Sequence, residues 1–215
     1  MNKYIIEPQT FLAKAINAIM YGNKPKTWKV SDKITINWQG VLPTPPENNS
    51  QATIEELEKI SQLTNDITSE QIDLVKLVDE DPILVFEKMI KKHSLGNHKE
   101  EFNRAWDLVK PVILNLKWQF NRARPYQLAE HYGLDIKVIE TETHHTPSYP
   151  SGHSAAAAMM GYILAEHYPE HSTEIFNNID LAGQARVFQG VHYPSDNDAS
   201  MVITGALWQD IKHNL

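Results

Sequence analysis

The chain has 215 residues, of which 41% are hydrophobic and 22% are charged, a composition typical of a globular protein rather than a disordered or fibrous one. It contains no cysteine, which excludes disulfides, thiolate metal sites and a cysteine nucleophile. Lys and Arg number 20 against 27 Asp and Glu, so the formal net charge is -7 and no nucleic-acid partner is expected.

The first fifty residues combine one predicted helix with an irregular stretch. Apolar residues recur at helical spacing over 11–19. Between Tyr21 and Ser50 the composition changes and prolines gather at 43–46, so an extended loop is expected there. Within this stretch, a short strand is predicted at Lys33–Trp38.

Two longer helices are expected in the middle of the chain. Apolar residues repeat at helical spacing over 54–63, and Thr53 with Glu56 three residues later forms a capping-box pattern at the start of this helix. Another helix is expected from about His98 to Leu116, with Pro111 bending it.

A shorter helix is expected between these two. Asp81 followed by Pro82 is typical of an N-cap and a first helical residue. The acidic stretch 79–81 is interpreted as the solvated start of that helix, and the basic stretch 91–93 as its C-terminal end, where cations complement the helix dipole.

No membrane-spanning segment is predicted. The longest apolar run, Ala155–Ala165, has 11 residues, whereas a helix that spans a membrane needs roughly 20. Residues Met1–Met20 include Glu7 and Lys14 among their apolar positions and lack a signal-peptide pattern. We therefore expect a soluble protein, with the cytoplasm as the default location.

Three segments in the second half carry residues suited to binding an anion. In the first, 117–125, Lys117 and Arg124 are seven residues apart and would share one face of a helix, so both can reach one oxyanion. Pro125 disfavours helical geometry at Arg124 and predicts that the helix ends there. The alternative is a basic helix end exposed to water.

The second segment, 146–153, is rich in turn-forming residues and precedes a predicted helix over 154–164. Free backbone N–H groups at a helix start bind anions, Gly152 permits close approach of the main chain, and Ser151 adds a hydroxyl donor. His153 would then lie beside the anion. The alternative is a plain loop with a serine N-cap and a solvated histidine.

The third segment, 185–196, offers Arg186, His192 and, four residues later, Asp196. A hydrogen bond from Asp196 to His192 would fix the tautomer of the imidazole and stabilise its cation while the other nitrogen acts as a nucleophile. Alternatively, Asp196 only caps a helix that begins near Ser195, and His192 is simply buried.

Taken together, the segments resemble the three-part signature of the type 2 phosphatidic acid phosphatase superfamily, which includes bacterial non-specific acid phosphatases and vanadium-dependent haloperoxidases. The signature is K-x6-R-P, then P-S-G-H, then S-R-x5-H-x3-D. The chain departs from it only at Ala185, where the signature has serine. The resemblance covers residues 117–196.

The resemblance implies an all-α, single-domain helical bundle of the acid phosphatase/vanadium haloperoxidase type. The domain would extend over residues 1–215, with an irregular N-terminal loop region. Residues 1–100 would form an N-terminal helical lobe without any part of the signature, and residues 101–215 would form the core that carries it.

The resemblance also implies a metal-independent phosphatase that acts on a soluble phosphomonoester and needs no cofactor. His192 would attack phosphorus to give a phosphohistidine, Asp196 would orient its ring, and His153 would protonate the leaving alkoxide. The residues implied to bind phosphate are Lys117, Arg124, Ser151, Gly152 and Arg186.

Two other functions stay open. The same residues would bind vanadate in a haloperoxidase, with His192 as the vanadium ligand, or the protein could be a phosphate-binding module without turnover. A homo-oligomer is compatible with the sequence. Side chains next to the signature that could line a pocket around the leaving group are Tyr126, Gln127, Tyr149, Phe188 and Tyr193.

Overall fold

The computed structural model describes residues 27–141 and 145–215, and these residues are folded into helices and connecting segments without any strand. The all-α prediction is therefore confirmed over this part of the chain, while the helix predicted over 11–19 lies outside it. In chain order the elements are η1 (Trp38–Gly40), α2 (Gln51–Asn65), α3 (Ser69–Glu80), η2 (Pro82–Phe86), α4 (Glu87–His93), α5 (Lys99–Phe120), α6 (Pro125–Ala129), η3 (Glu130–Tyr132), α7 (Gly152–His167), η4 (Pro169–His171), α8 (Ser172–Phe188) and α9 (Pro194–Ile211), where η denotes a 3-10 helix.

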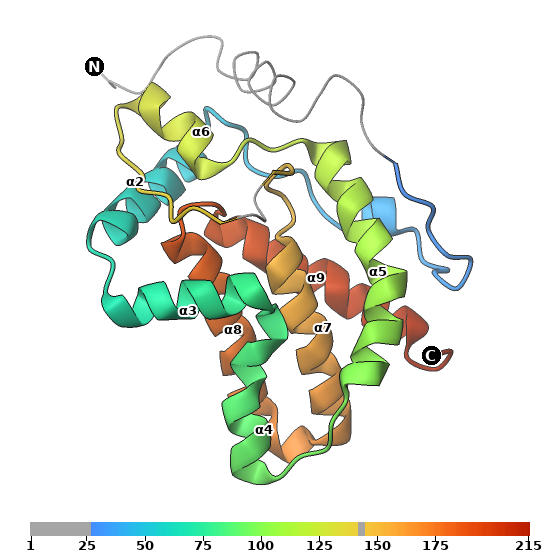
Figure 1. Cartoon of the computed structure of the whole chain (residues 1–215). Coiled ribbons are helices and arrows are strands. Elements are labelled where there is room, and N and C mark those ends of the chain that lie inside the picture. Colours follow the sequence, from blue (N-terminus) through green and yellow to red (C-terminus); the bar gives the residue numbers. More distant parts are fainter. Residues whose placement is uncertain (1–26, 142–144) are drawn as a thin grey trace.

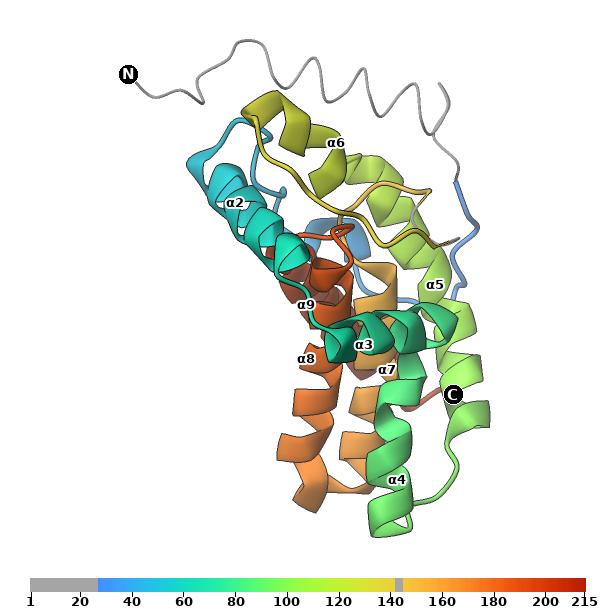
Figure 2. The same cartoon turned by 60° about the vertical axis from the view of Figure 1, so that its left-hand side comes forward.

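Helix α7 is the centre of the bundle. It packs against α8, α9 and α5, as Figures 1 and 2 show from two sides. Residues 155–158 are four buried alanines, and further along the helix the buried Gly161 brings Ile179 of α8 so close that an added Cβ would lie 2.4 Å from its Cδ1 atom. Small, apolar residues on all sides therefore explain why this helix can be enclosed by three others.

The predicted strand at Lys33–Trp38 is wrong. The backbone N–H groups of Thr35 and Ile36 donate to the carboxylate of Asp210 on α9, at 2.7 and 3.3 Å. One side chain from the far end of the sequence thus satisfies the donors that a neighbouring strand would have satisfied, and the segment is held in turns.

Helix starts differ from the predicted ones by a few residues. Ser50, not Thr53, caps α2, because its hydroxyl accepts from the Thr53 N–H. Asp81 accepts from the Ile83 N–H as predicted, but the residues that follow form the 3-10 helix η2 before α4 begins. Residues 79 and 80 are the end of α3 rather than the solvated start of a helix.

The segments of the signature meet at one end of the bundle. Asn121 adopts a left-handed conformation that ends α5 directly after Phe120, four residues earlier than the Arg124 boundary that was predicted. Arg124 then caps α6, while α7 and α9 begin at Gly152 and Pro194. The C-terminal end of α5 and the N-terminal ends of α7 and α9 therefore frame the same region.

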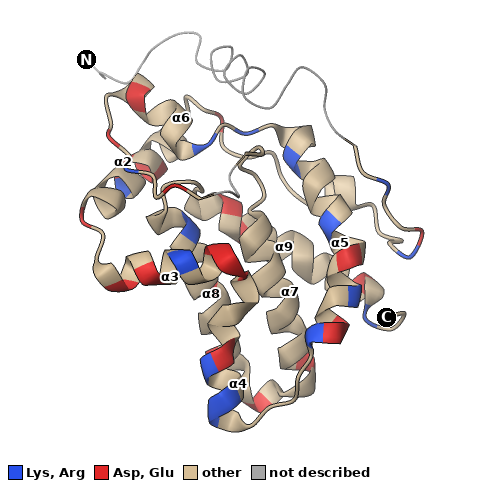
Figure 3. Ribbon diagram, in the orientation of Figure 1, with Lys and Arg blue, Asp and Glu red and all other residues tan. Residues whose placement is uncertain are grey.

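Figure 3 shows both acidic and basic residues along α4 and α5. In the part of the chain that the structure describes, we find no helix with the length and apolar character that crossing a membrane requires.

Candidate active site

A pocket of about 430 Å³ lies where the three segments meet. Lys117 and Arg124 of the first segment, Gly152 and His153 of the second, and His192 of the third all line it. The two imidazoles, 39 residues apart in sequence, thus face one cavity together with two cationic side chains.

His192 is buried and held at both nitrogens. Its Nδ1 lies 3.0 Å from Oδ2 of Asp196, and its Nε2 lies 3.0 Å from a guanidinium nitrogen of Arg124. Because a carboxylate can only accept and a guanidinium can only donate, these partners assign the proton to Nδ1 and the lone pair to Nε2. Burial, followed by the charge of Arg124, lowers the pKa of His192 well below its ordinary value, so the ring is neutral.

Asp196 is fully buried, and every neighbour holds it in the ionised form. Burial by itself raises the pKa of this carboxyl, but the charge of Arg122 and the hydrogen bond with His192 outweigh it, so the net pKa lies below the ordinary value. The Ser148 hydroxyl and the Tyr193 N–H also donate to Oδ2. As the third residue of α9 it caps that helix as well, so both interpretations of Asp196 hold together.

The three predicted cations are all buried. Lys117 donates to the carbonyl oxygens of Pro147 and Ser148, and burial followed by the Arg124 charge lowers its pKa well below the ordinary value. Arg124 donates to the carbonyl oxygens of Thr146 and Val191. Backbone carbonyls carry no formal charge, so these hydrogen bonds position both side chains without pairing them with a carboxylate.

Arg186 projects from α8 and forms a 2.9 Å ion pair with Asp79 at the end of α3. Burial lowers the pKa of Arg186 to about 10, and the hydrogen bond with Asp79 opposes this effect. The interpretation of the acidic stretch as solvated is therefore wrong for Asp79, which is directed toward a buried cation instead of water.

His153 lies in the first turn of α7 on the wall of the pocket. Burial, followed by the charge of Arg186, lowers the pKa of His153 to about 3. Lys117 and Arg124 add to this repulsion. The imidazole is therefore neutral at pH 7 as long as no anion balances the three surrounding cations.

The two remaining predicted anion-binding residues differ in position. Gly152 lines the pocket, and a Cβ there would meet Lys117 Cε at 3.7 Å, an ordinary contact, so steric crowding does not require glycine. Ser151 is the N-cap of α7, and its Oγ accepts from the Ser154 N–H and hydroxyl. The structure thus gives this hydroxyl a local capping contact.

Comparison with known proteins assigns this arrangement to a family. The family model described as "PAP2 superfamily" matches residues 108–212, which include all three segments. Residues 108–212 are therefore a PAP2 superfamily region.

Several bacterial proteins are similar to about half of this chain. It is 29% identical over 107 residues to a non-specific acid phosphatase of Salmonella typhimurium (strain LT2), covering 46% of this chain and 42% of that protein. It is 32% identical over 108 residues to the non-specific acid phosphatase of Salmonella typhi, covering 48% and 43%. The chain thus aligns with about two fifths of the length of these relatives. A solved structure entitled "Crystal structure of the first transmembrane PAP2 type phosphatidylglycerolphosphate phosphatase from Bacillus subtilis" aligns with a TM-score of 0.41 and 17% identity, covering 99% of this chain and 96% of that one.

The sequence alone did not single out Arg122. It donates to Asp196 at 2.7 Å, to the Ser195 hydroxyl at 2.8 Å and to Glu56 of α2 at 3.0 Å. Its guanidinium carbon also lies 3.8 Å from the centre of the Tyr193 ring. Arg122 is one of the three basic residues of the 117–125 segment, but nothing in the neighbouring sequence distinguishes it from an arginine exposed to water.

The first hundred residues therefore contribute to the PAP2 site although they carry no part of the signature. Glu56 accepts from Arg122, from the Ser195 hydroxyl and from the Ser195 N–H, and Asp79 accepts from Arg186. The Glu56 carboxylate of α2 thus holds Arg122, and the Asp79 carboxylate of α3 holds Arg186.

The wall of the pocket also differs from the predicted one. The five side chains proposed beside the signature are not among the described lining residues; Tyr149, for instance, donates to the Pro43 carbonyl. One face of α5 lines the pocket instead. Its residues Trp106, Lys110, Ile113, Leu114 and Lys117 follow helical spacing, a signal that could have been found by extending the Lys117 face backward along the helix.

Proposed function

We propose that this protein is a phosphatase that hydrolyses phosphomonoesters through a phosphohistidine on His192. The observation that carries the proposal is the pairing of a neutral, Asp196-bound His192 with cationic groups around the same pocket. The match of residues 108–212 to the PAP2 superfamily and the similarity of the chain to bacterial non-specific acid phosphatases support it.

The first step would transfer the phosphoryl group to His192. The lone pair on Nε2 attacks phosphorus, the bond from phosphorus to the ester oxygen breaks, and the leaving oxygen takes a proton from His153. Asp196, which accepts from Nδ1, stabilises the positive charge that develops on the His192 ring. The charges of Lys117, Arg124 and Arg186 would stabilise the equatorial oxygens of the transition state.

The second step would regenerate the enzyme. Water attacks phosphorus in line with the P–N bond, His153 takes a proton from that water, and the electron pair of the P–N bond returns to Nε2 of His192. Inorganic phosphate then leaves. His153 thus ends in the protonated form, ready to serve as the acid of the next cycle or to exchange its proton with solvent.

Substrate binding has to supply the condition under which His153 can hold a proton. In the ligand-free protein, burial and nearby cations lower its pKa to about 3. A phosphate dianion among these cations removes much of that repulsion, and an opposite charge within about 4–6 Å raises the pKa of a histidine by roughly 1–3 units. Because this rise leaves the pKa below 7, the acid would form only when a substrate is bound and the pH is acidic.

The α5 wall suggests what the leaving group looks like. Trp106, Ile113 and Leu114 give the pocket an apolar lining, and Lys110, which lines it too, is exposed. We therefore expect phosphomonoesters with an aromatic or apolar leaving group to be preferred over small, strongly polar ones, because their release from water adds to binding.

The experiment is an assay of p-nitrophenyl phosphate hydrolysis by wild type, His192→Ala, His153→Ala and, as a control, His213→Ala, whose side chain is exposed. We expect turnover in wild type and the control, none in His192→Ala, and a loss of roughly 10²–10⁴-fold in His153→Ala. Quenching into alkaline denaturant followed by mass spectrometry should detect phosphate on His192.

Two results would contradict the proposal. Vanadate-dependent bromination without phosphatase activity in the same preparation would establish the haloperoxidase instead. Binding of phosphate without turnover, unchanged by His192→Ala, would establish a phosphate-binding module.

A further inference from the structure

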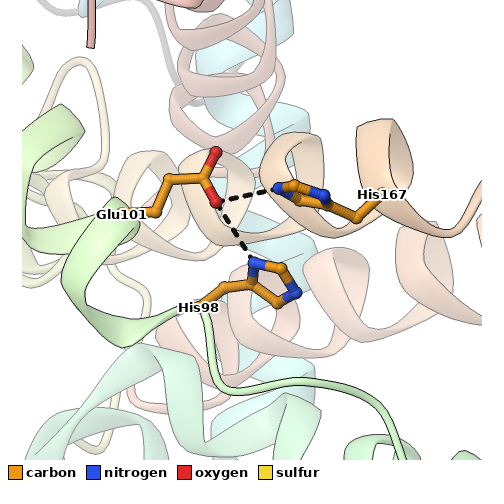
Figure 4. Close-up of side chains that lie close together, drawn as sticks. All are labelled: His98, Glu101 and His167. Atoms are coloured by element: carbon orange, nitrogen blue, oxygen red, sulfur yellow. Dashed lines mark hydrogen bonds and ion pairs between the residues drawn. The ribbon is translucent and has the colours of Figure 1, made fainter.

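A second cluster of ionisable side chains lies at the opposite end of the α5–α7 pair. His98 precedes α5, Glu101 is in its first turn, and His167 is the last residue of α7. Figure 4 shows one carboxylate oxygen of Glu101 between the two rings, 3.1 Å from His98 Nδ1 and 2.9 Å from His167 Nε2. By helical rise, Lys117 in the last turn of α5 lies about 24 Å from Glu101. The cluster is therefore separate from the candidate active site.

The contacts around His98 leave its Nδ1 directed at the Glu101 carboxylate and its Nε2 directed at the Tyr168 hydroxyl. The Tyr168 hydroxyl lies 3.0 Å from His98 Nε2 and accepts from the Gly96 N–H at 2.9 Å. When Nε2–H donates to that oxygen, a neutral His98 has its lone pair on Nδ1, facing the negative oxygen of Glu101. In this tautomer the two acceptors repel each other unless a cation lies between them; in the other tautomer Nδ1–H donates to Glu101 and the Tyr168 hydroxyl donates to Nε2, and a metal ion would replace the Nδ1 proton. An outer partner of this kind on the second ring nitrogen is usual for histidines that bind metals.

The donor set and its geometry suit a first-row transition metal. Two imidazole nitrogens and one carboxylate oxygen are common ligands of Zn²⁺, and all three ligand atoms here lie within 4.8 Å of one another. Adjacent ligands of tetrahedral zinc are roughly 3.3 Å apart, because each bond is about 2.0–2.2 Å long. The two N···O distances would lengthen by only a few tenths of an ångström.

Exposure leaves room for a fourth ligand. The His98 side chain is 14% exposed and that of Glu101 25%, whereas that of His167 is 43% exposed. Water can therefore complete the coordination from the His167 side. Within residues 27–141 and 145–215, this is the one group of at least three His, Asp or Glu side chains with such spacing.

A second histidine–carboxylate pair, His93 and Glu174, provides a control, because a lysine also contacts its carboxylate. His93 lies 2.8 Å from Glu174, but both oxygens of Glu174 also accept from the Lys92 ammonium, each at 3.1 Å. A cation of the chain itself already compensates that carboxylate. Within this cluster, the two imidazoles are the groups that contact the Glu101 carboxylate.

We propose that His98, Glu101 and His167 bind one divalent transition-metal ion, for which Zn²⁺ is the probe. The ion ties the N-terminal end of α5 to the C-terminal end of α7. Because these two helices carry Lys117 and His153 at their other ends, the site stabilises the helix pair that frames the pocket, and it does so without contact with substrate.

The test uses the full chain after chelator treatment, with Zn²⁺ titrated by calorimetry and thermal unfolding followed with and without the ion. Wild type and His93→Ala are expected to bind one more Zn²⁺ than His167→Ala and Glu101→Gln. At a free Zn²⁺ concentration 100 times its Kd, Tm should rise by roughly 5–10 °C in the first pair and not in the second. Mg²⁺, which prefers oxygen ligands, should produce no such difference.

Several outcomes would overturn the proposal. They are equal Zn²⁺ stoichiometry in wild type and His167→Ala, no rise of Tm with Zn²⁺ in wild type, and an equal loss of the rise in His93→Ala. Should Glu101→Gln fail to fold, His167→Ala decides alone, because the exposed His167 ring can be removed without opening the core.

Discussion

Arg122 offers the sharpest test of how this site is held together. Replacement by Met keeps an unbranched side chain of similar length and removes the guanidinium. Asp196 would then lose its 2.7 Å ion pair and Glu56 its 3.0 Å ion pair, while Asp196 stays fully buried. The contact of the guanidinium with the Tyr193 ring would be lost as well.

The size of the effect follows from burial. The side chains of Arg122 and Asp196 are 1% and 0% exposed, so solvent cannot compensate the remaining carboxylate. Removal of one partner of a buried ion pair costs about 3–5 kcal/mol, whereas an exposed pair contributes about 0–1 kcal/mol. For a protein of this size, each kcal/mol lowers Tm by about 2–4 °C, so Arg122→Met should lower Tm by roughly 6–20 °C.

The variant should also change catalysis through Asp196. The charge of Arg122 is one of the causes that keep the pKa of Asp196 low, so its removal raises that pKa and loosens the carboxylate that orients His192. We therefore expect kcat to fall while the KM for p-nitrophenyl phosphate changes less, because Arg122 is not among the residues that line the pocket.

The assay is thermal and urea-induced unfolding, with phosphatase kinetics measured at a temperature at which the variant is folded. Arg104→Met, on an exposed position of α5, is the matched control and should change the free energy of unfolding by less than about 0.5 kcal/mol. If Arg122→Met lowered the free energy of unfolding by less than about 1 kcal/mol, no more than the control does, the argument that it leaves a buried carboxylate without a compensating charge would be refuted.

Three further predictions concern the pocket and its supporting helices. Because the folded-state pKa of His153 is depressed, the unfolded chain binds this proton first, so His153 by itself should cost the ligand-free protein up to about 1.4 kcal/mol of stability per pH unit below pH 6.5, in addition to the loss from His192. His153→Asn should flatten the slope by one proton in urea titrations between pH 7 and 4. Asp79→Asn should lower kcat/KM by roughly 10- to 150-fold, the equivalent of about 1.5–3 kcal/mol for a hydrogen bond to a charged group. Glu80→Gln, at the next and exposed position, should leave kcat/KM unchanged. Equal values for both variants would contradict a role of the Asp79–Arg186 ion pair in catalysis. Gly161→Ala should destabilise the fold by about 1–3 kcal/mol, since its Cβ would lie 2.4 Å from Ile179, and unchanged unfolding curves would show that α7 and α8 separate without cost.

The sequence alone predicted the class of fold and several of the residues that line the pocket. Helical periodicity and the proline and glycine positions between helices are local properties, so the regions around α2, α5 and α7 were predicted with shifts of only a few residues. Lys117, Arg124, His153 and His192 were identified because their residue types and spacing match a known signature, and the structure places all four around one pocket. Their individual catalytic roles stay a proposal.

Only the tertiary structure decided which residues support that pocket. Glu56 meets Ser195 across 139 positions of sequence and Asp79 meets Arg186 across 107, and no local pattern links residues that far apart. The same reason explains the wrong strand at 33–38, where the backbone donors bond to an α9 side chain about 175 residues away.

The contacts that decide whether a charged side chain is solvated or buried form when α2 and α3 pack on α8, and when α5 packs on α7. Burial then sets the pKa values, because the cost of removing a charge from water depends on all surrounding elements at once. Residue types and their spacing along the chain therefore predict what the pocket can bind, and the packing of distant helices decides which groups are charged and what holds them in place.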